Sequence, residues 1–240
     1  MKKIVVAILM FMLIGCAAKM KPLPVFEIQK GSKIGVINFV GPKMKQYHVG
    51  TTIFNNFEKE YEVNWDIPGF INSEIKKQAS EIGYETVIIE ATDSLKTLLA
   101  NRSIKEGDKL VLNPSIQTAL DSLAKHYNID ILYIVEPLKS TIFVPNVEIP
   151  VEGYGVGTRN ILMIGGVEAS AMINGSAICM NPMALTRGSI CHKEQDVTGL
   201  KMVGNFRQLT DEEKSEYGKV IKGFIKEFVA EPLLQSNLKG

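Results

Sequence analysis

The chain has almost no charge imbalance and no hydrophobic run long enough to cross a bilayer. Its 240 residues contain 27 lysines and arginines against 26 aspartates and glutamates, which gives a net charge of +1. A nucleic-acid-binding protein needs an excess of basic residues to neutralise phosphates, so this charge balance argues against that class of protein. The longest apolar run, Ile4–Ile14, has eleven residues. A membrane-spanning helix needs about 20.

Familiar catalytic and nucleotide-binding motifs are missing as well. The sequence contains no Gly-Lys-Ser/Thr phosphate loop and no Gly-x-Ser-x-Gly nucleophile elbow. His48, His126 and His192 have no second histidine or cysteine at a metal-ligand spacing. We therefore expect no metal and no cofactor. With 45% hydrophobic residues, the chain can nevertheless bury a core.

The N-terminus has the composition of a signal peptide. Two lysines precede the apolar run, which has the length of a signal-peptide core. The run ends in Leu13-Ile14-Gly15-Cys16, which resembles a bacterial lipobox. That resemblance implies cleavage before Cys16 and attachment of acyl chains, palmitate among them, to make a membrane anchor. An ordinary signal peptide with an incidental cysteine, or an uncleaved anchor, stays open.

The predicted organisation divides the chain into four parts. Residues 1–15 are the signal peptide, 16–31 a lipidated tether, 32–232 a single α/β domain and 233–240 a tail. Removing residues 1–15 removes two lysines and no acid, which changes the net charge from +1 to −1. Ala17 resembles the sorting pattern of Gram-negative outer-membrane lipoproteins, which implies the periplasmic face of the outer membrane.

The remaining cysteines, Cys179 and Cys191, would lie outside the cytoplasm. They flank eleven residues rich in turn formers, which predicts a disulfide that closes this loop. A metal site that uses both cysteines and His192 lacks a fourth ligand at a recognisable spacing. Two free buried thiols are the other alternative.

Strand-like and helix-like segments alternate through the first half of the chain. Strands are predicted at 34–39, 86–89 and 129–135, and helices at 66–82, 93–100 and 114–128. Between the first strand and the first helix, alternating residues on both sides of Asn55-Asn56 predict a hairpin. This order predicts an α/β (α+β) fold with helices packed on a mixed sheet.

The second half of the sequence shows a different hydrophobic pattern. Residues 140–206 have no helical period and many glycines, which predicts an extension of antiparallel strands. Gly153-Tyr-Gly-Val-Gly157 is interpreted as a flexible turn or bulge, with a ligand contact as the alternative. Thr210-Asp-Glu-Glu213 is a capping box that opens an amphipathic helix to residue 231. Its apolar stripe is expected to pack on the sheet, or else to bind a partner.

This order of elements resembles a group of bacterial envelope lipoproteins. It is similar to the α/β domain shared by the curli secretion-channel lipoprotein, the penicillin-binding-protein activator lipoproteins and the N-terminal domain of the translocation protein TolB. The resemblance rests on the lipobox, the tether, the first strand, the helix that begins at Asp66 and the strand 86–89. The helix–strand unit 114–135 and the closing helix complete it. It implies an envelope accessory role, and its channel-forming member leaves a pore subunit open.

Aromatic side chains gather in one stretch of nineteen residues. The candidates for partner binding are Tyr47, His48, Phe54, Phe57 and Trp65. Aromatic residues are enriched at binding hot spots. The alternative is that these residues pack the stretch onto the sheet.

The sequence therefore predicts a non-enzymatic cell-envelope lipoprotein, an accessory or assembly subunit that binds another envelope protein. Its expected contacts are the membrane, through Cys16, and that protein partner, with no nucleic acid. A lipid-anchored enzyme acting on envelope polymers and a secretion-channel or pore subunit are the alternatives. An oligomer also stays open.

Overall fold

The computed structural model describes residues 31–50, 52–144, 147–161, 164–181, 183–196 and 208–230. The predicted signal peptide 1–15, the lipidation site Cys16 and the C-terminal tail 233–240 lie outside these residues, as does the predicted tether except Gly31. The helices are α2 (Ile67–Glu81), α3 (Asp93–Ala100), α4 (Gln117–Tyr127) and α5 (Asp211–Phe228), with short 3-10 turns η1 (Ile53–Asn55) and η2 (Pro114–Ile116).

Nine of the strands form one mixed sheet in the order β3-β2-β9-β10-β7-β1-β4, with β11 on β10 and β8 on β9. The strands of the first half are β1 (Lys33–Asn38), β2 (Lys43–Val49), β3 (Phe57–Glu62) and β4 (Glu85–Ile89). Those of the second half are β7 (Ile131–Pro137), β8 (Lys139–Val144), β9 (Val147–Ile161), β10 (Ile164–Met180) and β11 (Met183–Asp196). The predicted α+β class is confirmed.

The long strand β10 joins two halves of this sheet. Its first part pairs with β9, and the part from Ile173 pairs with β7. On the far side of these two strands lie β2, parallel to β9, and β1, parallel to β7. The segment from Lys33 to Val49 therefore runs in one direction along the sheet, with a break between the strands at residues 39–42.

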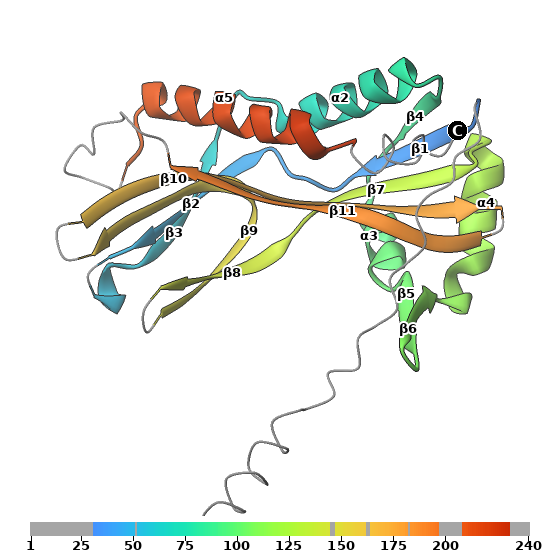
Figure 1. The fold of residues 1–240 in the computed structure, drawn as a ribbon, viewed down its shortest axis with the longest axis horizontal. Helices are drawn as coiled ribbons and strands as arrows, with labels where there is room; N and C mark the ends of the chain where they lie inside the picture. Colours follow the sequence, from blue (N-terminus) through green and yellow to red (C-terminus); the bar gives the residue numbers. More distant parts are fainter. Residues whose placement is uncertain are drawn as a thin grey trace, which may run out of the picture.

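Alternate residues of the strands point to opposite faces of the sheet and belong to two separate hydrophobic cores. Ile131, Tyr133 and Val135 of β7 belong to the larger core, which α2 and α5 cover. Leu132 and Ile134 belong to the second core, together with side chains of α3 and α4. Figure 1 shows α2 and α5 along one face of the sheet and α3, α4 and the β5–β6 hairpin on the other side. The period of two along each strand makes both faces apolar.

Local signals mark most of the helix ends, but α4 begins at Gln117, after the 3-10 turn η2 at its predicted start, and α5 ends at Phe228 rather than at residue 231. Asp66 caps α2 by accepting a hydrogen bond from Gly69 N, and Gly83, with a φ of +88°, follows the helix. Thr210 and Glu213 form the predicted capping box at α5. Asn128 ends α4 in the left-handed conformation, where asparagine is better tolerated than most residues.

Two elements were not predicted. Residues 103–112 form a separate two-stranded hairpin, β5 (Ser103–Glu106) and β6 (Lys109–Leu112), that turns at Gly107 with φ +61°. The first arm of the predicted hairpin is β2, which ends at Val49, and the 3-10 turn η1 follows at Ile53–Asn55, so the strand alternation expected at Ile53 is wrong. The second arm, β3, begins at Phe57 as expected.

The predicted disulfide is absent, because the β10–β11 register keeps the two cysteines apart. Cys179 lies opposite Ala184, whereas Cys191 lies opposite Ile173. Six residues of strand separate these positions by about 20 Å, and a disulfide needs Cα atoms within about 7 Å. Cys179 is a free, half-buried thiol, and burial raises its pKa.

The glycine run 153–157 lies inside β9 rather than in a turn. Gly153, with φ +78°, marks the point where β9 stops pairing with β8 and starts pairing with β10. Gly155 lies against β2, since a Cβ there would meet the Lys45 carbonyl oxygen at 1.8 Å. The run is a bend in a strand that lets two backbones approach closely.

Candidate functional site

The structure does not bring the five aromatic candidates into one surface. Tyr47, His48 and Trp65 are buried, and Phe57 is half-buried. Phe54 is 91% exposed. Most of the cluster therefore packs the fold, and Phe54 is the member that can meet another molecule.

Tyr47 and His48 point to opposite faces of β2, and each ties β2 to β9. The Tyr47 hydroxyl accepts a hydrogen bond from Glu152 N at 2.8 Å and donates one to Glu152 O at 3.2 Å. Burial raises the pKa of Tyr47. His48 Nδ1 lies 2.8 Å from Thr158 Oγ1, and its ring stacks on Phe57 with centroids 4.8 Å apart. Both side chains are engaged in the fold.

Lys45 lies between acids of β3 and β9 on the same face as Tyr47. Its Nζ is 3.5 Å from Glu58 Oε1 and 3.6 Å from Glu152 Oε2. Burial alone would lower the pKa of Lys45, but Tyr47 and the two carboxylates raise it on balance. These ion pairs link three neighbouring strands.

The loop that carries Phe54 is braced by its own polar groups. Gly50 N donates a hydrogen bond to Asn56 Oδ1 at 2.9 Å, which closes the base of the loop. Asn55 N donates to Thr52 O at 3.0 Å within the turn. A Cβ on Gly50 would lie 2.3 Å from the Asn55 Cβ, so the two sides of the loop nearly touch. This loop, residues 52–56, is called the tip below.

The tip lies far from the place where the described chain begins. Gly31 precedes β1, and the tip follows β2, so the two are separated by the segment that runs along the sheet. In Figure 1, β1 and the strands β2 and β3 accordingly lie toward opposite ends of the sheet. Phe54 is therefore presented at the end of the molecule remote from Gly31.

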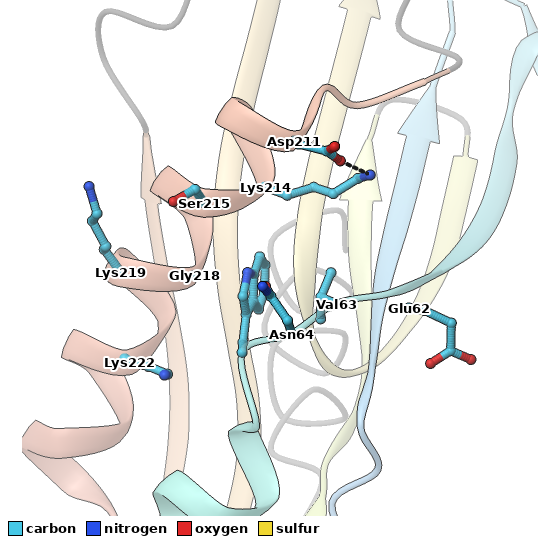
Figure 2. A pocket seen from close by; sticks show the side chains of 10 residues that line it. Glu62, Val63, Asn64, Asp211, Lys214, Ser215, Gly218, Lys219 and Lys222 are labelled. Carbon is cyan, nitrogen blue, oxygen red and sulfur yellow. Dashed lines mark hydrogen bonds and ion pairs between the residues drawn. The ribbon is translucent and has the colours of Figure 1, made fainter.

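A second feature is a groove between α5 and the segment that joins β3 to α2. It has a volume of about 580 Å³. Figure 2 shows Lys214, Lys219 and Lys222 of α5 around it, with Glu62 on the other side. Lys214 Nζ lies 2.9 Å from Asp211 Oδ1, and Lys219 Nζ lies 2.6 Å from Glu216 Oε1. Two of the three lysines are thus already paired on their own helix.

Trp65 lines this groove and packs against α5. A Cβ on Gly218 would lie 2.7–2.9 Å from three atoms of the indole, so the helix can approach the ring only at a glycine. The ring also lies near Tyr154 of β9, with centroids 6.3 Å apart. The only tryptophan of the chain is therefore a packing residue between a linker, a helix and the sheet.

The comparisons with known proteins find distant structural likeness. No family model matches the chain, and no curated protein matches it. Among solved structures it is similar to the hypothetical protein CT253 from Chlamydia trachomatis, with 10% identity, a TM-score of 0.41 and coverage of 86% of this chain and 95% of that one.

Two other similar structures are PelC and a lipoprotein. The PelC dodecamer from Paraburkholderia phytofirmans has 10% identity and a TM-score of 0.36, covering 90% of this chain and 94% of that one. Lipoprotein GNA1162 from Neisseria meningitidis has 9% identity and a TM-score of 0.31, covering 82% and 96%. These sequence identities and TM-scores are too low for any of the three structures to indicate what this chain does.

A polar cluster that the sequence did not predict lies where β7 and β10 pair. The Arg102 guanidinium contacts both carboxylate oxygens of Glu136 and donates to Leu99 O at 2.9 Å. Asn174 Nδ2 donates to Glu136 Oε1 at 3.0 Å. The cluster connects the end of α3 with β7 and β10. No local motif could have found it, because its members come from three separate elements.

The described residues hold neither a metal cluster nor a membrane-spanning helix. No three histidine, cysteine, aspartate or glutamate side chains among them lie close enough to hold a metal ion. Within the same ranges, no helix is both long and apolar enough to cross a membrane. The tip and the α5 groove are the features left as candidate contact sites.

Proposed function

We propose that the chain is a lipid-anchored accessory subunit of the cell envelope that binds another envelope protein through its tip. The observation that carries this proposal is the 91% exposure of Phe54. Burying a phenylalanine side chain contributes about 1.5–3 kcal/mol, and aromatic side chains are enriched in interfaces. A partner with an apolar pocket would gain this contribution.

The braced loop favours binding as well. Ordering a flexible loop on binding costs conformational entropy, which weakens an interface. The bonds from Gly50 to Asn56 and from Asn55 to Thr52 hold the tip before any partner arrives. Phe54 can therefore enter a pocket with little further ordering of the backbone.

The position of the tip suits a protein held by Cys16. Residues 16–31 can span up to about 50 Å when extended. An anchor at Cys16 on the periplasmic face of the outer membrane would hold the end of the domain that carries Gly31. The tip, at the other end of the sheet, would then be free to meet a protein some distance from that anchor.

Site-specific photocrosslinking in the native envelope tests this proposal. A photoreactive phenylalanine analogue is placed at Phe54 and, as a control, at Ile104, which is also an exposed apolar residue but lies on β5. We expect the first variant to crosslink to one envelope protein of defined mass and the second to give no such product. Phe54→Ala should reduce recovery of the same protein with the purified chain.

Three outcomes would count against the proposal. Crosslinks at position 54 only to lipid would point to a membrane contact. Crosslinks only to a second copy of the chain would point to self-association. Equal products at positions 54 and 104 would mean that the tip has no special role.

A further inference from the structure

The α5 groove is lined by hydrogen-bond donors that the fold leaves unused. The Trp65 side chain is only 7% exposed, yet its Nε1–H has no acceptor in the described part of the chain. Buried polar groups in folded proteins are almost always hydrogen-bonded, so a donor of this kind indicates an acceptor that comes from solvent or from a ligand.

The Trp65 N–H lies beside Gly218, in the wall of the groove. A Cβ on Gly218 would lie 2.8 Å from Nε1, and both residues line the groove. Among the described residues, the side-chain atoms that are fully buried without a hydrogen bond are Thr186 Oγ1 and Tyr217 Oη. Nε1 is therefore still accessible, and an acceptor in the groove can reach it.

Two further polar side chains lie near this N–H on the walls of the groove. Ser215 is three residues before Gly218 on α5, so the two share one side of the helix. Figure 2 shows Asn64 across the groove from Ser215. Neither the Asn64 amide nor the Ser215 hydroxyl forms a hydrogen bond within the described ranges. Both can donate to a ligand without breaking a bond of the fold.

The charges of the groove leave one cation without a counter-ion. The two acids are paired already, because Glu62 Oε1 lies 3.5 Å from Lys43 Nζ and Asp211 Oδ1 lies 2.9 Å from Lys214 Nζ. Lys222, four residues after Gly218, has no carboxylate at ion-pair distance in the part of the chain that the structure describes. The groove therefore favours an anion over a neutral or cationic ligand.

Two smaller hollows lack this combination. The hollow of about 230 Å³ beside the bend of β9 is lined by Lys43 and Glu60, which pair at 3.5 Å, and by Lys45 and Glu152, which pair at 3.6 Å. In the hollow of about 360 Å³ at the tip, Glu58 is likewise paired with Lys45. The α5 groove differs from both in having a larger volume, an unpaired cation and unused donors.

We propose that the α5 groove binds a small soluble ligand that carries a carboxylate or phosphate group. Lys222 supplies the positive charge, and the Trp65 and Asn64 N–H groups donate to oxygen atoms of the ligand. Hydrogen bonds to an ionised acceptor are stronger than those between neutral groups. This site is separate from the tip, so the proposal does not depend on the proposed function.

The size of the groove restricts the ligand further. Its volume of about 580 Å³ lies within the range of about 300–1,000 Å³ that is typical of small-molecule sites. A lone phosphate or acetate would leave most of this volume empty. The ligand therefore has the size of a sugar acid or a sugar phosphate, with hydroxyl groups that can accept from Ser215 or Asn64.

Titration of the purified full chain tests the site, because Trp65 is the only tryptophan and reports on the groove directly. The probes are glucose 6-phosphate and glucuronate. Glucose at the same concentration and sodium chloride at the same ionic strength are the controls. With at least one charged probe we expect a saturable change in fluorescence and a downfield shift of the indole N–H resonance, and neither change with the controls.

Variants of two lysines on α5 test the role of the charge. Lys222→Gln should raise the dissociation constant at least about tenfold, because a hydrogen bond to a charged group is lost. Lys222→Arg keeps the charge and should retain most of the binding. Lys226→Gln is the matched control, since Lys226 is exposed on the same helix but does not line the groove. Thermal unfolding verifies that all three variants are folded.

Four outcomes would overturn the proposal. They are no response to either charged probe, an equal response to glucose, equal weakening by Lys222→Gln and Lys226→Gln, and an indole resonance that does not move on saturation. A response only to hexaglutamate, or only to vesicles that contain phosphatidylglycerol, would assign the groove to a protein segment or a lipid and would also overturn it. None of these results bears on the crosslink at position 54, so failure here leaves the proposed function standing.

Discussion

Two buried tyrosine hydroxyls differ in whether they have a partner. Tyr133 Oη donates to Val229 O at 2.8 Å. In the part of the chain that the structure describes, Tyr217 Oη is buried without a hydrogen bond. A buried unsatisfied polar group destabilises the folded state, whereas a bonded one contributes to stability. The two hydroxyls should therefore respond in opposite ways to removal.

We predict that Tyr217→Phe raises the free energy of unfolding by about 1 kcal/mol, because it removes an unpaired hydroxyl. Tyr133→Phe should lower it by about 1 kcal/mol, because it leaves the Val229 carbonyl without its donor. Urea unfolding of both variants measures the difference. A loss of stability in Tyr217→Phe as large as that in Tyr133→Phe would contradict the prediction.

The same tyrosine predicts how stability changes at alkaline pH. Burial, followed by the charge of Glu213, raises the pKa of Tyr217 from 10.0 to about 12. Above pH 10 the unfolded chain loses this proton while the folded chain keeps it, so unfolding becomes more favourable. We expect the free energy of unfolding to fall as the pH rises from 10 to 12. Tyr217→Phe should fall less steeply over that interval, and an identical slope would exclude this tyrosine as a cause.

Residue type and spacing could not show that Phe54 is exposed and Trp65 is buried. Both are aromatic and lie in the same short stretch, but Trp65 is covered by Gly218 of α5, far along the chain. The exposure of a side chain depends on what packs opposite it, and this information is not local. The predicted aromatic stretch therefore contains one strongly exposed side chain, Phe54, together with residues of the core.

At the level of elements, α5 carries two glycines in contrasting surroundings. A Cβ on Gly218 would lie 2.7 Å from Trp65 Cε2, whereas nothing lies within 4 Å of a Cβ on Gly223. We predict that Gly218→Ala lowers the free energy of unfolding by about 1–3 kcal/mol through overpacking. Gly223→Ala should raise it by about 1 kcal/mol, because alanine favours the helix.

Denaturant midpoints of these two variants provide the measurement. They form a matched pair, since both place a methyl group on the same helix. Trp65 fluorescence should also shift in Gly218→Ala and stay unchanged in Gly223→Ala. A similar change in stability for both variants would mean that Trp65 does not pack on α5 as described.

Local signals predicted the helices better than the strands. Asp66, Asn128 and the capping box at Thr210 act within one turn of the helix, so the sequence nearby is enough to identify them. The strand β2 depends on partners elsewhere, since it pairs with β3 and with the distant β9. The sequence of β2, Lys-Met-Lys-Gln-Tyr-His-Val, contains two lysines that pair with acids of β3, and these contacts appear only in the folded sheet.

At the level of the whole molecule, the pairing register of the strands determines which residues lie close together, and spacing along the sequence did not predict this. The cysteines at 179 and 191 have a loop-like separation, but β10 and β11 extend past them as a long hairpin. The glycine run, which was interpreted as a flexible turn or bulge, is a bend inside β9 where this strand changes partners. In both segments, pairing over long strands stabilises extended backbone that the local sequence does not predict.

The proposed lipid anchor gives a prediction for the complete chain. Cys16→Ser removes the thiol that would carry the lipid, so we expect the protein to leave the membrane fraction or to remain unprocessed. The domain should unfold at the same temperature as the wild type, because Cys16 precedes all described elements. Cell fractionation, mass spectrometry of the N-terminus and thermal unfolding measure the three effects.

Cys179→Ala is the matched control for this experiment. It removes a half-buried thiol within the sheet, so it should change stability and leave membrane attachment intact. The crosslink at position 54 should also weaken in Cys16→Ser, because the tip would no longer be held near its partner, and persist in Cys179→Ala. Normal processing and membrane retention of Cys16→Ser would contradict the anchor, while the contact made by Phe54 would have to be explained without it.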